Sequence, residues 1–259
     1  MSFWEHIEAL RWHLMRAVAA ILVFGIVAFL NRHFVFDEVL LSPMRNDFIT
    51  TRWLCQLAEW VAMPVLCLDN SKLHVINITM SGQFMTHMYI SFMTGLVLAF
   101  PYVIWEIWRF IKPALKPKEQ RYSTAAVVVI SFLFLLGILF SYFLIVPMTI
   151  NFLGTYQVSE SVENTVSLNS YISTVVSLSF SMGIVFELPV FVFFLAKVGI
   201  VSAVLLKRYR KMIIVVFFVV AAIITPPDAF SQMMVAIPLL LLYEISIVVA
   251  RKARKTQEA

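Results

Sequence analysis

The stretch from Ser123 to Pro147 contains no charged residue, and it restricts the chain to few kinds of fold. A helix needs about 20 apolar residues to cross the hydrocarbon core of a bilayer, so this stretch is long enough to span one. The whole chain is 61% hydrophobic and 14% charged, with a mean hydropathy of +0.89. Soluble domains are about 45–50% apolar and about 25% charged. We therefore expect a polytopic membrane protein.

Five further apolar stretches surround this one, and no segment between them is long enough for a separate soluble domain. We expect an all-α fold, a single integral membrane domain over residues 1–259, with six spans at about 12–31, 83–110, 123–147, 169–202, 212–226 and 229–250. The fifth span is short, because sixteen residues between Lys211 and Asp228 make a helix of about 24 Å. The longest loop, residues 32–80, should begin with an amphipathic stretch at Val35–Met44 and end in extended chain at Leu73–Thr79.

The distribution of basic residues predicts the orientation. With six spans both termini lie on one side, and that side carries sixteen of the 20 Lys and Arg residues: Arg11, Arg16, Arg109, Lys112, Lys116, Lys118, Arg121, Lys197, Lys207, Arg208, Arg210, Lys211, Arg251, Lys252, Arg254 and Lys255. Only Arg32, Arg45, Arg52 and Lys72 fall on the other side. The positive-inside rule makes the basic side cytoplasmic. The N-terminus lacks the basic start and cleavage site of a removable signal peptide.

Cys55 and Cys67, the only cysteines, fall in the loop assigned to the outside. They could form a disulfide there, or remain a pair of free buried thiols.

One acidic residue, Glu187, lies inside the fourth apolar stretch, two residues before Pro189. A charge at the middle of a membrane helix costs about 2.5–3.5 kcal/mol on insertion scales. The proline removes a backbone donor, so we expect a kink or break. Glu187 is then either a structural acid hydrogen-bonded in the bundle or a functional group facing a partner or a wet cavity.

The sequence does not favour catalysis or a metal centre. It contains no His-Glu-x-x-His motif, no Gly-rich phosphate loop and no nucleophile elbow, so we expect no enzyme activity, no cofactor and no metal. Several acids near the basic side remain: Glu5, Glu8, Glu106, Glu119 and Glu244. Each could be a rim salt bridge worth at most about 1 kcal/mol. Together they would also suit a cationic ligand such as a basic peptide.

A series of motifs runs through nearly the whole chain in a fixed order. They are His6-Ile7-Glu8-Ala9-Leu10-Arg11, Ser42-Pro43, Pro101, Trp108-x-Phe110-x-x-Pro113-x-Leu115-x-x-x-Glu119, Phe186-Glu187-x-Pro189, Thr225-Pro226-Pro227-Asp228-x-Phe230-Ser231-Gln232 and Ile237-Pro238. In this order, on six spans, the sequence resembles the TatC family, the signal-peptide-receptor subunit of the twin-arginine (Sec-independent) protein translocase.

The resemblance implies a concave, glove-like bundle in the bacterial plasma (inner) membrane, with both termini cytoplasmic. It implies a receptor that binds twin-arginine signal peptides of folded cargo and assembles with small single-span partners of the TatA/TatB type for proton-motive-force-driven export. The implied signal-peptide-binding residues are Glu8, Arg11, Phe110 and Glu119. Glu187, Thr225 and Gln232 match the intramembrane pocket and partner-docking positions, and Pro43, Pro101, Pro113, Pro189, Pro227 and Asp228 match further motif positions.

The N-terminal motif departs from the family pattern. The family places its acid immediately before Leu-Arg, where this chain has Ala9, and the acid here is Glu8. One residue on a helix rotates a side chain by about 100°, so Glu119 is the firmer prediction. The alternative function is a proton- or solute-coupled secondary transporter with Glu187 as the relay, although the missing internal repeat counts against it.

Overall fold

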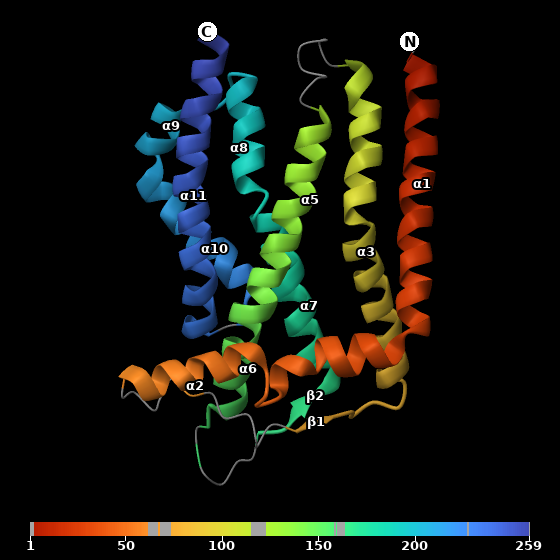
Figure 1. Cartoon of the computed structure of the whole chain (residues 1–259), viewed down its shortest axis with the longest axis vertical. Coiled ribbons are helices and arrows are strands. Elements are labelled where there is room, and N and C mark those ends of the chain that lie inside the picture. The colour runs from red at the N-terminus through yellow and green to blue at the C-terminus, as the bar shows by residue number, and fades with distance from the viewer. Residues whose placement is uncertain are drawn as a thin grey trace. The chain divides into compact units, whose positions relative to one another are not determined.

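The structure, a computed structural model, describes residues 3–61, 67, 74–114, 123–157, 159, 164–226 and 228–258 (Figure 1). The chain divides into two compact units. Unit 1 comprises Met1–Leu41 and Asn77–Leu133, and unit 2 comprises Ser42–Ile76 and Phe134–Ala259. Almost all regular structure is helical, as the hydropathy predicts, because a segment in the bilayer must pair its own backbone groups.

Unit 1 is built on two long helices that lie side by side, α1 (Phe3–Leu30) and α3 (Gly82–Ile111) (Figure 1). Small residues let their backbones approach closely. A Cβ atom added to Gly95 would lie 2.6 Å from the backbone nitrogen of Gly25, which is sterically impossible. Ala17, Ala28 and Ala99 are buried on the same helices. This is the small-residue packing by which membrane helices associate without a hydrophobic driving force.

The rest of unit 1 is short. A π-helix, η1 (Phe34–Leu40), follows α1, and a 3-10 turn, η4 (Lys112–Ala114), ends α3. Helix α5 (Ser123–Phe140) belongs to unit 1 as far as Leu133.

Unit 2 contains most of the remaining helices around α11 (Ala229–Glu258). Helix α11 packs along α8 and α10, and the core is formed by buried residues such as Leu178, Met182, Val235 and Leu239. The other elements are η2 (Ser42–Met44), α2 (Ile49–Val61), η5 (Ser141–Ile145), α6 (Val146–Thr155), α7 (Leu168–Val185), α8 (Leu188–Lys197), α9 (Ala203–Arg208) and α10 (Arg210–Ile224). Two short strands, β1 (Val75–Ile76) and β2 (Val166–Ser167), pair in parallel with Val75 opposite Val166.

Five described helical segments are long and apolar enough to cross a membrane: Ile7–Leu30, Gly82–Ile111, Ala126–Thr155, Leu168–Lys197 and Ala229–Lys252. They match five of the six expected spans. The sixth expected span is α10, which has 15 residues and ends at Ile224. The expectation of a short fifth helix is therefore confirmed, whereas the count of six crossings and the single-domain assignment stay predictions.

Several helices begin or end at residues other than those of the predicted spans. The first helix begins at Phe3 and not near residue 12, and the last continues to Glu258. The third span does not stop at Pro147, because the chain passes through the π-helix η5 into α6, where Pro147 occupies the first turn and needs no intrahelical donor. The fourth ends at Lys197 and not at residue 202. Its predicted break is confirmed, since α7 ends at Val185 and α8 begins at Leu188.

The long loop contains more structure than the sequence predicted. The stretch expected to be amphipathic forms η1 and η2, and the expected extended end contains β1, but α2 between them was missed. The question of the cysteines is settled, because Cys55 and Cys67 form a disulfide.

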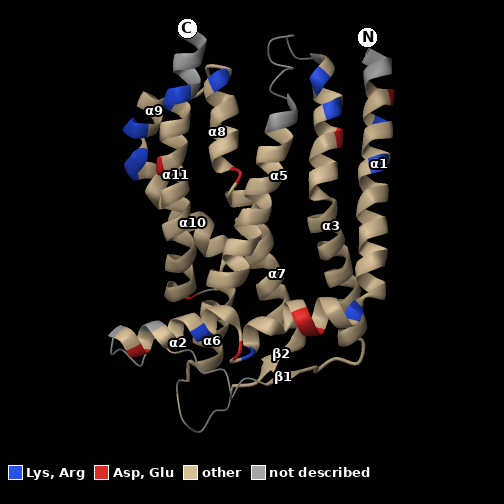
Figure 2. Cartoon of the chain, viewed as in Figure 1, with Lys and Arg blue, Asp and Glu red and all other residues tan. Residues whose placement is uncertain are grey.

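In each unit the basic residues gather at one end of the helices (Figure 2). In unit 1 this end is the start of α1 and the end of α3. In unit 2 it is the end at which α8 stops and α9 lies, and α2 lies at the opposite end (Figure 2). The charge asymmetry that set the predicted orientation is therefore present within each unit separately.

Candidate functional site

One face of α3 carries three polar side chains near its basic end. Tyr102, Glu106 and Arg109 follow one another at intervals of four and three residues, so they lie on the same side of the helix. Pro101 lies just before them within the helix. The Tyr102 hydroxyl donates to Glu106 Oε1 over 2.9 Å, and Arg109 Nη1 lies 3.4 Å from the same oxygen. The Glu106 side chain is only 2% exposed, so these contacts replace water around a buried carboxyl group.

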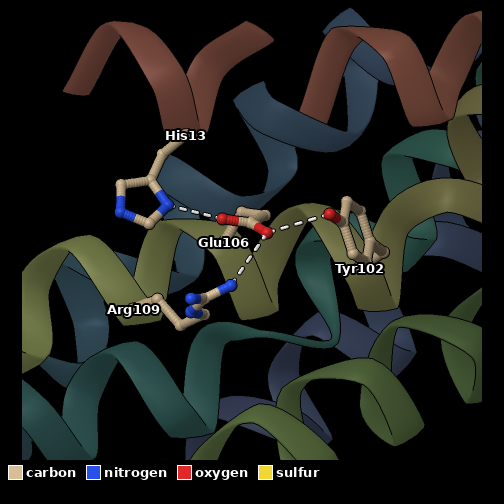
Figure 3. A network of polar contacts seen from close by, with 4 residues as sticks. All are labelled: His13, Tyr102, Glu106 and Arg109. Carbon is tan, nitrogen blue, oxygen red and sulfur yellow. Dashed lines mark hydrogen bonds and ion pairs between the residues drawn. The ribbon is translucent and has the colours of Figure 1, made fainter. Parts of the chain in front are cut away.

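The fourth member of this group comes from α1. His13 Nδ1 lies 2.5 Å from Glu106 Oε2, and Figure 3 shows the carboxyl group between His13 and Tyr102, with Arg109 below it. An ionised carboxylate only accepts hydrogen bonds, so in that state Nδ1 must carry the proton of this contact. This contact joins α1 to α3. If either side chain were removed, the other would be left as an unpaired polar group in an apolar environment. We call His13, Tyr102, Glu106 and Arg109 the His13–Glu106 network.

Phe110, a predicted signal-peptide-binding residue, lies beside this network. Its ring makes an edge-to-face contact with the His13 ring, with 6.2 Å between the centroids. The structure thus brings Phe110 to the N-terminal helix, one residue after Arg109. Helix α3 then ends in η4, which contains Pro113. The predicted Glu119 lies outside the described residues.

Glu8 and Arg11 are on α1, and both are exposed. At 100° per residue, Glu8 is turned about 140° from His13 around the helix, whereas Ala9 is turned only about 40°. The position where the family carries its acid is therefore on the side of α1 that faces α3. Glu8 points well away from it, which agrees with the expected rotation.

Glu187, in unit 2, lies at the break between α7 and α8. Gly183 and Phe134 pack closely nearby, since a Cβ atom on this glycine would lie 2.8 Å from the Phe134 ring. Both Glu187 carboxylate oxygens are buried, and neither is hydrogen-bonded to a side chain among the described residues. A buried carboxyl group without a side-chain donor is rare in a folded protein, and it is available to a ligand, a water molecule or a partner.

Thr225, Asp228 and Gln232 come together at the junction of α10 and α11. The Thr225 hydroxyl donates to the Ala221 carbonyl at 2.9 Å, and Gln232 Nε2 donates to the Phe218 carbonyl at 2.9 Å. Asp228 Oδ1 accepts from the Ser231 backbone nitrogen at 2.6 Å, which caps the start of α11. These three residues therefore hold the junction at the end of the short helix.

The described motif prolines lie in short helical turns, in a first turn of a helix or, for one of them, inside a long helix. Pro43 is buried in η2, Pro101 is inside α3, Pro113 is in η4 and Pro189 is in the first turn of α8. Pro227 is outside the described residues. Among the described residues, no three His, Cys, Asp or Glu side chains are grouped so that they could hold a metal ion.

Sequence reasoning noticed Glu106 as an acid in an apolar helix but did not find its partners. His13 was not predicted as a site residue at all. The available signal was a histidine near the basic end of the first span, seven residues after His6, together with a buried acid on another span. Glu244 was also left without its partner, which is Arg210 at 2.7 Å between Nη2 and Oε2.

The chain resembles known proteins along almost all of its length. Residues 5–238 match the family model described as "Sec-independent protein translocase protein (TatC)". The protein of that name from Blattabacterium sp. subsp. Periplaneta americana is 38% identical over 252 residues, which is 96% of this chain and 95% of the relative. Its counterpart from Carboxydothermus hydrogenoformans is 35% identical over 97% of this chain and 93% of the relative.

A solved structure shares the fold. The crystal structure of a twin-arginine translocase receptor, TatC, in DDM matches with a TM-score of 0.75 and 32% identity, over 95% of this chain and 99% of that chain. A second crystal structure of this receptor gives a TM-score of 0.70 at 31% identity.

Proposed function

Because the chain belongs to the TatC family of Sec-independent protein translocase proteins, we propose that it is the subunit that binds twin-arginine signal peptides. Family membership makes it a multi-pass membrane component of a Sec-independent protein translocase. The proposal adds the ligand, the folded cargo that carries it, and recognition at the cytoplasmic face of the bacterial inner membrane.

The observation that supports this proposal most is the contact of Phe110 with His13. The His13–Glu106 network fixes the N-terminal helix against the end of α3, where Phe110 lies and from which the chain continues toward Glu119. A signal peptide that contacts both the N-terminal motif and the segment after α3 requires these two parts of the chain to lie close together. In this proposal the network positions the binding residues and does not itself touch the ligand.

Carboxylates suit the proposed ligand because arginine carries a planar, permanently charged guanidinium group. Two N–H donors of that group can bind one carboxylate, which a lysine ammonium group cannot imitate. Glu119 is the proposed primary contact. Glu8 is a weaker candidate because the helix turns it away from the face that carries His13.

The experiment is photocrosslinking of a twin-arginine signal peptide to Glu119→Ala in membranes, compared with the unchanged chain at equal protein level. We expect the crosslink to be lost while the protein remains inserted. Glu244→Ala is the matched control, because it also removes a carboxyl group near the predicted cytoplasmic face. The Glu244 side chain is half exposed and is paired with Arg210. Equal crosslinking by Glu119→Ala and the unchanged chain would reject the assignment.

Unit 2 provides the proposed contact with single-span partner subunits of the TatA/TatB type. Thr225 and Gln232 lie at the end of α10. The 15 residues of this helix cover about 22 Å, which is less than the hydrocarbon core of about 30 Å. A partner helix with a polar side chain could pair with this junction or with Glu187. Assembly there would couple signal-peptide binding to proton-motive-force-driven export.

A second candidate function rests on Glu187 alone. Its buried carboxylate oxygens have no hydrogen-bonding side chain among the described residues, at a proline-broken helix, and such groups also serve as proton relays in secondary transporters. Export measured with Glu187→Gln distinguishes the two functions, as argued in the Discussion.

A further inference from the structure

Helix α2 is fixed to unit 2 along one face. The ring of Phe48, just before the helix, stacks on Phe143 with 5.7 Å between centroids and meets Tyr142 edge-on at 5.6 Å. The Thr50 hydroxyl donates to the Phe143 carbonyl. Thr51 and Ala58 are 2% and 3% exposed. The buried face of α2 therefore packs on the π-helix η5.

This attachment places α2 near one surface of the membrane. The helical path from Ser123 to Phe143 covers about 30 Å, which is the thickness of the hydrocarbon core. Figure 1 shows α2 running across unit 2, whereas α7, α8 and α11 run along it. Helix α2 lies at the end away from α9, where most of the basic residues of that unit gather (Figure 2).

The face of α2 opposite the buried one is apolar and uncovered. Ile49, Trp53 and Trp60 are 60%, 68% and 86% exposed. At 100° per residue they fall within about 40° of one another around the helix, roughly opposite Thr51 and Ala58. Two indole rings exposed on one stripe are unusual on a surface that only meets water.

The charged and amide side chains of α2 occupy a single flank between these two faces. Arg52, Gln56 and Glu59 lie within about 60° of one another, and all three are exposed. Leu54, about 160° from Gln56, is on the other flank and is partly buried. Around the circumference of α2, the side packed on protein is therefore followed by the polar flank, then by the indole stripe and then by the apolar flank.

We propose that α2 is a membrane-surface helix whose Ile49–Trp53–Trp60 stripe lies in the headgroup boundary of the leaflet opposite the basic ends of unit 2. Its four sides then meet protein, water, lipid headgroups and hydrocarbon, as expected for an amphipathic helix in the plane of the interface. Tryptophan is enriched at this depth because its ring is apolar and its N–H is polar.

The lipid surface fits the stripe better than a protein partner for two reasons. The charged and amide residues border it on one flank only, whereas protein interfaces carry a polar rim around an apolar centre. The same unit also exposes apolar side chains of η5, for example Phe143 and Leu144, which are 37% and 38% exposed, as expected where a unit meets lipid. The Cys55–Cys67 disulfide ties α2 to the chain that follows it.

The test uses tryptophan fluorescence of the full chain in vesicles of brominated or unbrominated phosphatidylcholine. The emission of Trp53 and Trp60 is obtained as the difference between the unchanged chain and Trp53→Phe/Trp60→Phe, two substitutions at exposed positions. We expect brominated lipid to remove about half or more of this difference, and bromines near the headgroup to quench it more than bromines deep in the acyl chain.

The matched control is the difference measured with Trp12→Phe/Trp105→Phe, which removes two exposed indoles of unit 1 and reports lipid contact of the spans. If that signal is quenched and the Trp53/Trp60 difference is unaffected by bromine, the proposal is wrong. Quenching that appears only when the protein is diluted in lipid also overturns it, because a second copy of the chain would then cover the stripe. Neither outcome depends on signal-peptide binding.

Discussion

Glu106 in unit 1 and Glu187 in unit 2 both hold a buried carboxyl group among apolar residues, and their surroundings differ. Glu106 lies on the uninterrupted helix α3 and contacts a histidine, a tyrosine and an arginine. Glu187 lies at a break between α7 and α8 and has no hydrogen-bonding side chain among the described residues. Both acids carry the cost of burial in an apolar environment. Among the described residues, only Glu106 has that cost offset by side-chain partners.

The difference has a simple origin in the surrounding residues. Tyr102 and Arg109 lie four residues before and three after Glu106, so the helix itself supplies two partners. The corresponding neighbours of Glu187 are Gly183 and Val190, which supply no polar side chain. A buried acid whose own helix provides donors is suited to hold structure together. One without them is suited to bind something else, and substitutions can test this distinction.

The largest effect is expected at Glu187. If Glu187 acts by hydrogen bonding to a partner helix, Glu187→Gln keeps shape and hydrogen-bonding capacity and should retain much of the export activity. Glu187→Ala removes the polar group, so both export and crosslinking to the partner's membrane helix should be lost. The measurement is export of a folded reporter at equal protein level.

A proton-relay role of Glu187 predicts a different pattern. An amide cannot release a proton, so Glu187→Gln should then be as inactive as Glu187→Ala. Equal activity of the unchanged chain and both variants would reject the two roles together and leave Glu187 as a tolerated structural acid.

The next largest effect is expected at Glu106, and it concerns stability. Glu106→Ala removes the acceptor of three donors and should lower the free energy of unfolding by about 2–3 kcal/mol. Thermal unfolding in mild detergent measures it. Glu187→Ala in the same assay is the matched comparison, and it should lose less than about 1 kcal/mol because it breaks no side-chain hydrogen bond among the described residues. A larger loss for Glu187→Ala would refute the contrast between the two acids.

The sequence predicted the parts of the molecule that follow from hydropathy. Five spans, the short α10 and the break near Pro189 depend on local runs of apolar residues and on a missing backbone donor, and both are visible in a single chain. The sequence did not predict where some helices continue. Pro147 was taken as an end, but a π-turn before it lets the helix continue to Thr155. Helix α2 was missed because its 13 residues are too few to span a membrane and its polar flank interrupts the apolar run.

The site was predicted less completely, because its contacts join distant parts of the sequence. His13 and Glu106 are 93 residues apart, and Arg210 and Glu244 are 34 apart, so no local pattern pairs them. The family motifs did identify Phe110, which the structure places against His13. They could not show that Ala9, and not Glu8, shares the face of α1 that carries His13, because that required the helix to extend back to Phe3.

The smallest effect is expected for Glu244, the third acid within an apolar helix, and it shows the other limit of the comparison. Arg210 and Glu244 are joined at 2.7 Å, but their side chains are 47% and 50% exposed, so water screens the pair. Such exposed pairs contribute about 0.2–1 kcal/mol, and Glu244→Ala should lower the free energy of unfolding by no more than that. High salt should abolish the difference from the unchanged chain, whereas it should leave the loss in Glu106→Ala intact. A salt-resistant loss in Glu244→Ala as large as that of Glu106→Ala would mean that burial does not decide which acid supports the fold.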